Sequence, residues 1–133
     1  MGEKTILVVE DNAMNMKLMR AVLQTGDYQI LEAEDAETGL RLVREHHPDL
    51  ILMDIQLPGM DGLSAARIIK NDQELKDIPI FALTGFAMES DKEKAIDSGL
   101  VGYIVKPFSV KGLLDTIANY FNEHADKAQA YGH

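Results

Sequence analysis

Residues 48–62 read PDLILMDIQLPGMDG, and this stretch is the strongest single indicator of the fold. It contains four consecutive apolar residues, Leu50 to Met53, which is the composition of a short buried strand. The run ends on Asp54, and Pro58 and Gly59 turn the chain away shortly after it. Because a buried strand is rigid, it holds a carboxylate at its tip in a well-defined position. Asp54 is therefore a candidate functional residue.

Comparable apolar runs recur along the chain and alternate with segments of helical spacing. The predicted strands are Ile6–Val9, Tyr28–Ala33, Leu50–Met53, Ile78–Leu83 and Val101–Val105. Strand and helix alternating five times is typical of an α/β fold whose parallel sheet is covered by helices on both faces. We therefore predict a doubly wound, five-stranded parallel sheet of order 2-1-3-4-5, in a flavodoxin-like three-layer α/β/α arrangement.

The helical segments are recognised by apolar residues that recur three or four positions apart. Those with such spacing are 15–23, 36–43 and, most clearly, 110–121, while the polar segment 87–98 is the least well marked. Asp35 and Ser109 occupy predicted N-cap positions, and Asp61 precedes a further helix.

The chain has 133 residues, no cysteine and a formal net charge of −9. This length favours one domain, predicted over residues 1–121, with residues 122–133 as a tail that is disordered or extends the last helix. An acidic surface repels phosphate backbones and anionic membranes, so direct binding to nucleic acid or to a membrane is not expected. No apolar run is long enough for a signal peptide or a membrane span, and a cytoplasmic protein is the expectation.

Polar residues stand at the predicted carboxyl ends of the strands, which is where open α/β sheets bind ligands. Glu10 and Asp11 follow the first strand, Asp54 ends the third, Thr84 follows the fourth, and Lys106 follows the fifth. The second strand runs out into residues 32–35, but we expect it at the border of the sheet, away from the point where strand order reverses. The central strands therefore bring three carboxylates, one hydroxyl and one ammonium group to the same side.

The chemistry of this set follows from its charge. Two carboxylates about 4 Å apart repel each other by on the order of 4 kcal/mol at an effective dielectric constant of about 20. A divalent cation relieves that repulsion, and oxygen ligands favour Mg²⁺, or alternatively Mn²⁺, over zinc. Mg²⁺ commonly shares its coordination shell with a phosphoryl group, for which Lys106 and Thr84 supply a cation and a hydrogen-bond donor. Asp54 would then be the nucleophile, and the product would be an aspartyl phosphate.

Four stretches of the sequence carry a resemblance to a known family. They are ILVVEDNAMN (6–15), PDLILMDIQLPGMDG (48–62), IPIFALTGFA (78–87) and GYIVKPF (102–108). Together they resemble the receiver domain of response regulators in two-component signalling, the CheY-like superfamily, from about Thr5 to Phe121. Any one of these motifs is weak, whereas four in the same order, each at a strand end, are specific.

The resemblance implies a role for each matching residue. Asp54 is implied to be the phospho-acceptor, which takes a phosphoryl group from a histidine kinase or a histidine phosphotransfer protein. Thr84 and Lys106 are implied to bind phosphoryl oxygens, and Tyr103 is implied to be an aromatic switch residue. The implied Mg²⁺ ligands are the side chains of Glu10, Asp11 and Asp54 and the backbone carbonyl of Gln56.

The resemblance also implies how the signal leaves the domain. The output surface would comprise the fourth helix, the fifth strand and the fifth helix, and it would bind a protein partner. No output domain is expected after the fifth helix, so the chain is similar to single-domain receivers of the DivK type; the alternative is a receiver excised from a hybrid histidine kinase. We expect a monomer or a phosphorylation-dependent dimer. It would not be an enzyme, beyond assisting its own phosphorylation and dephosphorylation.

Simpler explanations exist for each residue taken alone. Asp54 could cap a loop, Glu10 and Asp11 could cap the first helix, Lys106 could be solvated, Thr84 could begin the fourth helix, and Tyr103 could be a packing aromatic. These explanations do not account for the arrangement of all the groups at the strand ends.

Other functions on the same fold require different residues. A Mg²⁺-dependent phosphatase that uses a phospho-aspartate typically needs a second acid two residues after the nucleophile, where this chain has Gln56. A flavin-binding electron carrier needs a phosphate loop rich in Ser, Thr and Gly, where this chain has EDNAMN (10–15). A receiver-like scaffold that is never phosphorylated would not need the intact acids.

Overall fold

The computed structural model describes residues 4–57, 59–84, 99–105 and 109–132, with side chains described as far as Glu123. The predicted helix 87–98 and the predicted site residue Lys106 lie outside the described residues.

Five parallel strands form one sheet in the order β2-β1-β3-β4-β5, which confirms the predicted topology. The strands are β1 (Thr5–Val9), β2 (Gln29–Ala33), β3 (Leu50–Asp54), β4 (Ile80–Thr84) and β5 (Gly102–Val105). Strand β4 begins two residues later than predicted, because Pro79 has no N–H to donate and the Ile78 N–H donates to the Leu75 carbonyl instead.

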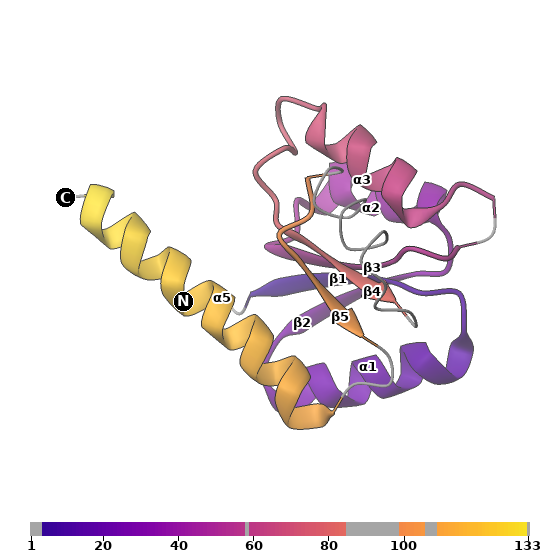
Figure 1. Cartoon of the computed structure of the whole chain (residues 1–133), viewed down its shortest axis with the longest axis horizontal. Coiled ribbons are helices and arrows are strands. Elements are labelled where there is room, and N and C mark those ends of the chain that lie inside the picture. The colour runs from indigo at the N-terminus through magenta and orange to yellow at the C-terminus, as the bar shows by residue number, and fades with distance from the viewer. Residues whose placement is uncertain (1–3, 58, 85–98, 106–108, 133) are drawn as a thin grey trace.

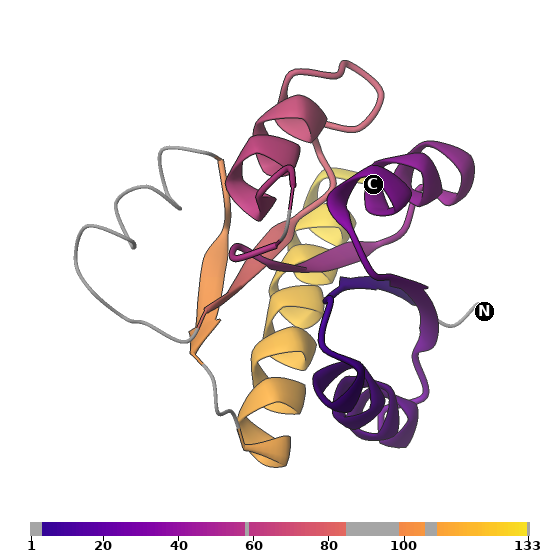
Figure 2. The same cartoon turned by 90° about the vertical axis from the view of Figure 1, so that its right-hand side faces the viewer.

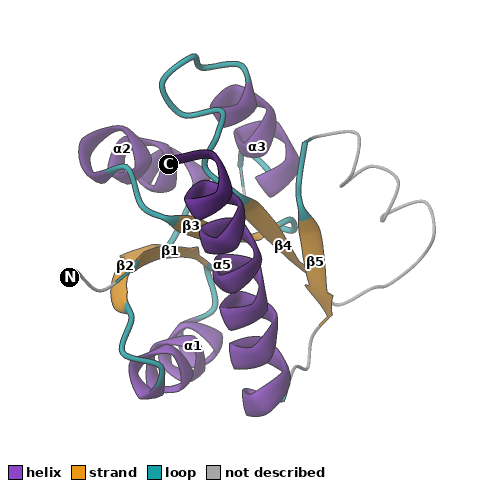
Figure 3. Cartoon of the chain, turned by 90° about the vertical axis from the view of Figure 1, so that its left-hand side faces the viewer, coloured by secondary structure: helices purple, strands orange, loops and turns teal. Residues whose placement is uncertain are grey.

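The described helices are α1 (Ala13–Thr25), α2 (Ala36–His46), α3 (Gly62–Lys70) and α5 (Val110–Gly132). Helices α2 and α3 cover one face of the sheet, while α1 and α5 cover the other (Figure 1). The turned views show the same three layers (Figure 2 and Figure 3). The C-terminal part of α5 continues beyond the sheet (Figure 1).

Alternate residues of the central strands enter two separate apolar clusters, one on each face. On β1, Leu7 and Val9 pack with α2 and α3, whereas Ile6 and Val8 pack with α1 and α5. Every residue of β3 and β4 is buried. This explains why these strands read as unbroken apolar runs, since both faces of a parallel sheet are covered. On the α5 side, the rings of Phe81 and Tyr120 meet edge-on at a centroid distance of 5.7 Å.

Side-chain caps define where three of the helices begin. Asp35 accepts a hydrogen bond from the Thr38 N–H at 2.7 Å and caps α2, as predicted. Asp61 caps α3 in the same way. For α5, the Ser109 hydroxyl accepts from the Gly112 N–H at 2.9 Å.

The prediction that Glu10 and Asp11 could cap the first helix is wrong. The N-cap of α1 is Asn12, whose side-chain oxygen accepts from the Asn15 N–H at 2.9 Å. The cap therefore lies one residue beyond Asp11, and the helix does not take up the Asp11 carboxylate.

Among the described residues, no helix combines the length and the apolar character that crossing a membrane requires.

Candidate functional site

Three carboxylates meet at the end of the sheet where the strands finish, which we call the carboxyl end. Val9 of β1 pairs with Met53 of β3, so Glu10 and Asp54 leave neighbouring strands side by side. Glu10, Asp11 and Asp54 each offer one oxygen, and these three oxygens all lie within 4.8 Å of one another. The topology thus brings together the three acids that the sequence predicts at one site.

Two of these carboxylates are removed from water and oriented by the backbone. Glu10 is 1% exposed and Asp54 is 4% exposed, whereas Asp11 is exposed. The Asn12 N–H donates to Oε2 of Glu10 at 3.2 Å. The Gln56 N–H donates to Oδ1 of Asp54 at 2.8 Å. Because a peptide N–H bonds each of these carboxylates, the backbone at the two strand ends helps to fix their positions.

Thr84 lies on the next strand along the sheet. Asp54 pairs with Leu83 of β4, and Thr84 follows Leu83 as the last residue of that strand. The Thr84 side chain is 4% exposed, so its hydroxyl is buried at the carboxyl end of the sheet. This places a hydroxyl on the strand adjacent to Asp54, as predicted.

The remaining predicted site residues lie further out or are not described. Tyr103 stands on β5, beside Ala82 of β4, and is 37% exposed. Gln56 follows β3, and its side chain is exposed, while its backbone N–H donates a hydrogen bond to the Asp54 carboxylate. Lys106 lies outside the described residues, so its predicted place opposite the acids stays a prediction.

A close backbone approach supports the site, and the sequence reasoning did not identify it. A Cβ on Gly62, the first residue of α3, would lie 2.3 Å from the Asp54 carbonyl oxygen and 2.8 Å from Cα of Ile55. Both are main-chain atoms that no side-chain rotation can move. The motif PGMDG (58–62) contains the signal, because its final glycine lets α3 begin directly against the chain that carries Asp54.

The arrangement fits a hard divalent cation. The donor set contains only carboxylate oxygens, which suit Mg²⁺ or Mn²⁺ better than zinc. Three like charges at such short separations repel one another unless a cation or a proton joins them. Glu10, Asp11 and Asp54 are the residues that would hold the ion.

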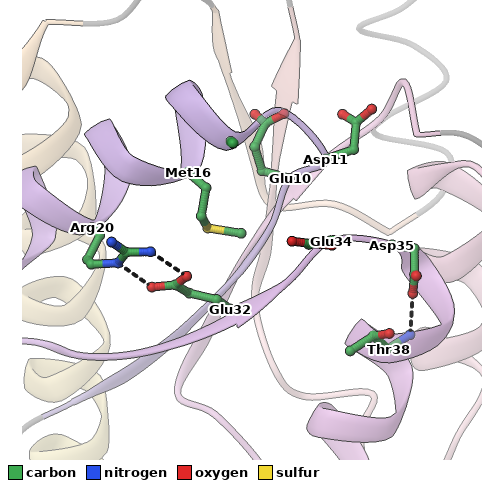
Figure 4. Close-up of a pocket in the computed structure, with 9 residues that line it drawn as sticks. Glu10, Asp11, Met16, Arg20, Glu32, Glu34, Asp35 and Thr38 are labelled. Atoms are coloured by element: carbon green, nitrogen blue, oxygen red, sulfur yellow. Dashed lines mark hydrogen bonds and ion pairs between the residues drawn. The ribbon is translucent and has the colours of Figure 1, made fainter.

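A cavity of about 390 Å³ adjoins the acids between α1 and β2 (Figure 4). Glu10 and Asp11 line it at one end, and Met16 lies between them and an ion pair of Arg20 with Glu32. The remaining lining residues are Ala13, Glu34, Asp35 and Thr38. Residues 32–35 at the end of the second strand were expected to lie away from the site. Three of them line the same cavity as Glu10 and Asp11.

The ion pair at the far end of this cavity is bidentate. Arg20 donates from Nε and from Nη2 to the two carboxylate oxygens of Glu32, with Nη2 to Oε1 at 2.8 Å. The hydrogen bond from Arg20 lowers the pKa of Glu32 below its usual value, although partial burial opposes this shift. Both side chains remain substantially exposed, so the pair ties α1 to β2 only weakly.

Comparison with known proteins places this architecture among signalling domains. A sequence model of the response regulator receiver domain matches residues 6–118. The polar-differentiation response regulator DivK of Brucella ovis is 44% identical over 120 residues, which cover 90% of this chain and 98% of that protein. The protein of the same name from Brucella anthropi is 43% identical over the same length.

Solved structures share the fold over nearly their whole length. The receiver domain of sensor histidine kinase PA1611 from Pseudomonas aeruginosa superimposes with a TM-score of 0.84 at 32% identity, covering 91% of this chain and 99% of that one. That structure contains a magnesium ion coordinated in the active site cleft. A CheY-like receiver domain from Methanospirillum hungatei gives a TM-score of 0.87 at 25% identity, covering 95% of this chain and 99% of that one.

Proposed function

Because the chain belongs to the response regulator receiver domain family, we propose that it accepts a phosphoryl group on Asp54 within a two-component phosphorelay. The observation that carries this proposal is the cluster of Glu10, Asp11 and Asp54, whose oxygens lie within 4.8 Å of one another with Asp54 at the tip of a buried strand. The donor is a phosphohistidine on a histidine kinase or a histidine phosphotransfer protein.

The transfer is a displacement at phosphorus. A carboxylate oxygen of Asp54 forms a new O–P bond while the N–P bond of the phosphohistidine breaks, and the bonding electrons pass to the imidazole nitrogen. Mg²⁺, or alternatively Mn²⁺, held by Glu10, Asp11, Asp54 and the Gln56 carbonyl, would neutralise charge on the phosphoryl oxygens. The Gln56 N–H orients the Asp54 carboxylate before the reaction.

The phosphorylated state is read out through Thr84 and Tyr103. Thr84 ends β4, the strand next to the one carrying Asp54, so its hydroxyl can donate to a phosphoryl oxygen. Lys106 provides a second contact with the phosphoryl group. Tyr103 stands on the outer strand β5 and is partly exposed, so a change in its packing would alter the surface around β5 and α5. A protein partner binds that surface.

The protein acts as a phosphorylation-controlled binding module and catalyses only its own phosphorylation and dephosphorylation. Gln56 stands two residues after Asp54, where a phosphatase of the phospho-aspartate type needs an acid to protonate a leaving group. Its amide cannot carry out that step. In this proposal the chain works as a DivK-type regulator, and a receiver unit of a hybrid histidine kinase is the alternative that the likeness to the PA1611 domain supports.

Intact-mass spectrometry after incubation with Mg²⁺ and a small acyl-phosphate donor tests the phosphoryl chemistry. We expect one added phosphoryl group on the wild type and none on Asp54→Asn. Asp61→Asn is the matched control, because it removes a nearby carboxylate but keeps an N-cap side chain for α3. Unmodified wild type, or equal modification of Asp54→Asn, would overturn the proposal.

A further inference from the structure

Lys70, the last residue of α3, bonds to the chain that leads into β4. Its Nζ donates to the carbonyl oxygen of Lys76 at 2.9 Å and to that of Ile78 at 2.7 Å. Both carbonyls belong to the connection 71–79, which is already anchored by the buried side chain of Leu75. One ammonium group thus gathers two peptide carbonyls just before the strand that ends in Thr84.

The carbon stem of the same side chain lies against the chain that leads into β5. A Cβ on Gly99 would be 2.8 Å from Cγ of Lys70, and Gly99 has a φ of +88°, in the region that favours glycine. Leu100, the next residue, is buried in the cluster on the α2 and α3 face. The Val101 N–H then donates to the Ile80 carbonyl at 2.9 Å, at the start of β4. Lys70 therefore contacts both the segment that enters β4 and the segment that enters β5.

The ammonium group of Lys70 is partly desolvated at this position. Burial lowers the pKa of Lys70, and the nearby Asp77 opposes that shift only in part. An apolar side chain of similar length would fill the same space without desolvating an ammonium group. It could not, however, donate to the Lys76 and Ile78 carbonyls. What lysine contributes here, and an apolar side chain cannot, is the pair of hydrogen bonds that it donates to these carbonyls.

We propose that Lys70 is a positioning residue that holds the entrances of β4 and β5 together at the amino end of the sheet, where the strands begin. Its hydrogen bonds fix the end of the side chain on the connection 71–79, and the fixed stem holds the turn at Gly99. Since β4 carries Thr84 and β5 carries Tyr103, the clamp also sets the spacing of these two residues. This last consequence rests on the proposed function, whereas the clamp itself does not.

Hydrogen exchange of the full chain, followed by mass spectrometry, tests the clamp without any phosphorylation. The variant is Lys70→Met, which keeps a stem of similar length but cannot bond the carbonyls. We expect exchange to accelerate about five-fold or more both in 71–79 and in 99–105, while exchange in β1 stays unchanged. Lys76→Met is the matched control, because residue 76 contributes its backbone carbonyl to the clamp. It should exchange like the wild type.

Every other exchange pattern overturns the proposal. Faster exchange in 71–79 alone would make Lys70 an anchor for one loop. Equal acceleration in β1 would show general destabilisation, and no acceleration would show that the hydrogen bonds hold neither segment. Because none of these results involves Asp54, they separate a failure of the clamp from a failure of the proposed phosphoryl chemistry.

A double-mutant cycle tests the contact with Gly99 directly. Gly99→Ala should lower the Tm of the wild type, since the new methyl group meets Cγ of Lys70 and the backbone has positive φ. The same substitution should lower the Tm less in a Lys70→Ala background, where the steric part is relieved. Equal decreases in both backgrounds would overturn the proposed contact.

Discussion

The two ends of the sheet use charge in opposite ways. At the carboxyl end, the oxygens of Glu10, Asp11 and Asp54 lie within 4.8 Å of one another, and two of these residues are buried. At the amino end, Asp49 and Lys70 also bond peptide groups, but neither belongs to that cluster of acids. Asp49 accepts from the Thr5 N–H at 2.8 Å, and Lys70 donates to two carbonyls.

This difference separates charges that favour the folded state from charges that repel one another within it. A charge that bonds to the backbone satisfies a group that would otherwise need water, and it favours the folded state. Like charges that converge on one point oppose folding until a cation or a reacting group arrives. The fold tolerates the second arrangement because the acids follow or end β1 and β3, two strands that are largely buried in the sheet.

The largest expected effect comes from adding a methyl group at Gly62, where the start of α3 packs against the Asp54 carbonyl. Gly62→Ala places a methyl group 2.3 Å from the Asp54 carbonyl oxygen, so either α3 or the end of β3 must move. We expect the free energy of unfolding to fall by about 3 kcal/mol or more, as measured by urea denaturation. Gly59→Ala is the control, because Gly59 has positive φ but no atom within 4 Å of the added methyl group. It should lose only about 1 kcal/mol.

The second prediction concerns the divalent cation. Mg²⁺ should raise the free energy of unfolding of the wild type, because it binds the folded state preferentially. Asp11→Asn should weaken Mg²⁺ binding by about 10-fold or more. Even a substitution of a residue that contacts only a metal ligand typically lowers metal affinity by about 10- to 100-fold. Calorimetric titration measures both affinities. Glu34→Gln removes another carboxylate lining the same cavity and should leave Mg²⁺ affinity nearly unchanged; an equal loss would show that only general negative charge attracts the ion.

The third prediction is that removing a carboxylate changes the free energy of unfolding in opposite directions at the two ends of the sheet. In the absence of divalent cations, Asp54→Asn should raise the free energy of unfolding by about 1–3 kcal/mol, because it removes one of three converging charges. Asp49→Ala at the amino end should instead lower it by about 1 kcal/mol, through loss of the hydrogen bond from Thr5. Urea denaturation at low salt with a chelator measures both. Destabilisation by Asp54→Asn would contradict the contrast drawn between the two ends.

The smallest effect is the pH dependence of the ion pair between Arg20 and Glu32. The hydrogen bond from Arg20 lowers the pKa of Glu32 in the folded state relative to its ordinary value of 4.5. The stabilisation is therefore fully present above pH 4.5 and is lost as the pH falls through the lower folded-state pKa. Glu32→Gln should lower the Tm by no more than about 2 °C at neutral pH, since the pair is exposed.

Scanning calorimetry from neutral to acidic pH measures this difference. The Tm of Glu32→Gln and that of the wild type should converge in acid, and high salt should also reduce their separation. Glu34→Gln, which removes a neighbouring carboxylate of the same strand end, is the control. A difference that persists unchanged in acid would show that Glu32 acts through packing and not through its charge.

Much of the fold was predictable because its signals are local. The run Leu50–Met53 is apolar on both faces, which is typical of a buried parallel strand. Asp35 and Asp61 could be predicted as helix caps because each bonds the N–H of the residue three positions later, within its own short segment. The parallel order then made the convergence of Glu10, Asp11 and Asp54 a geometric consequence. The cap of α1 was less predictable, because Asp11 and Asn12 are both good capping residues and only the backbone conformation distinguishes them.

Other features depend on distances that no local pattern encodes. The contact of α3 with the Asp54 carbonyl, the clamp formed by Lys70, and the cavity that brings residues 32–35 beside Glu10 all join segments from different parts of the chain. Their signals in the sequence are a glycine, a lysine and three acids, which are ordinary residues in any surface segment. Only the packing of helices on the sheet gives them neighbours.

The sequence by itself determined the alternation of strands and helices and the identity of the three acids, because hydrophobic periodicity and strand-end chemistry act over a few residues at a time. The strand order was predicted from the number of strands, since doubly wound sheets use few orders. Tertiary structure decided the separation of the acid oxygens, which backbone N–H groups hold them, and how the amino end of the sheet is tied together. These quantities are set by helix packing and strand register, where a displacement of one ångström changes a contact but leaves the sequence pattern the same.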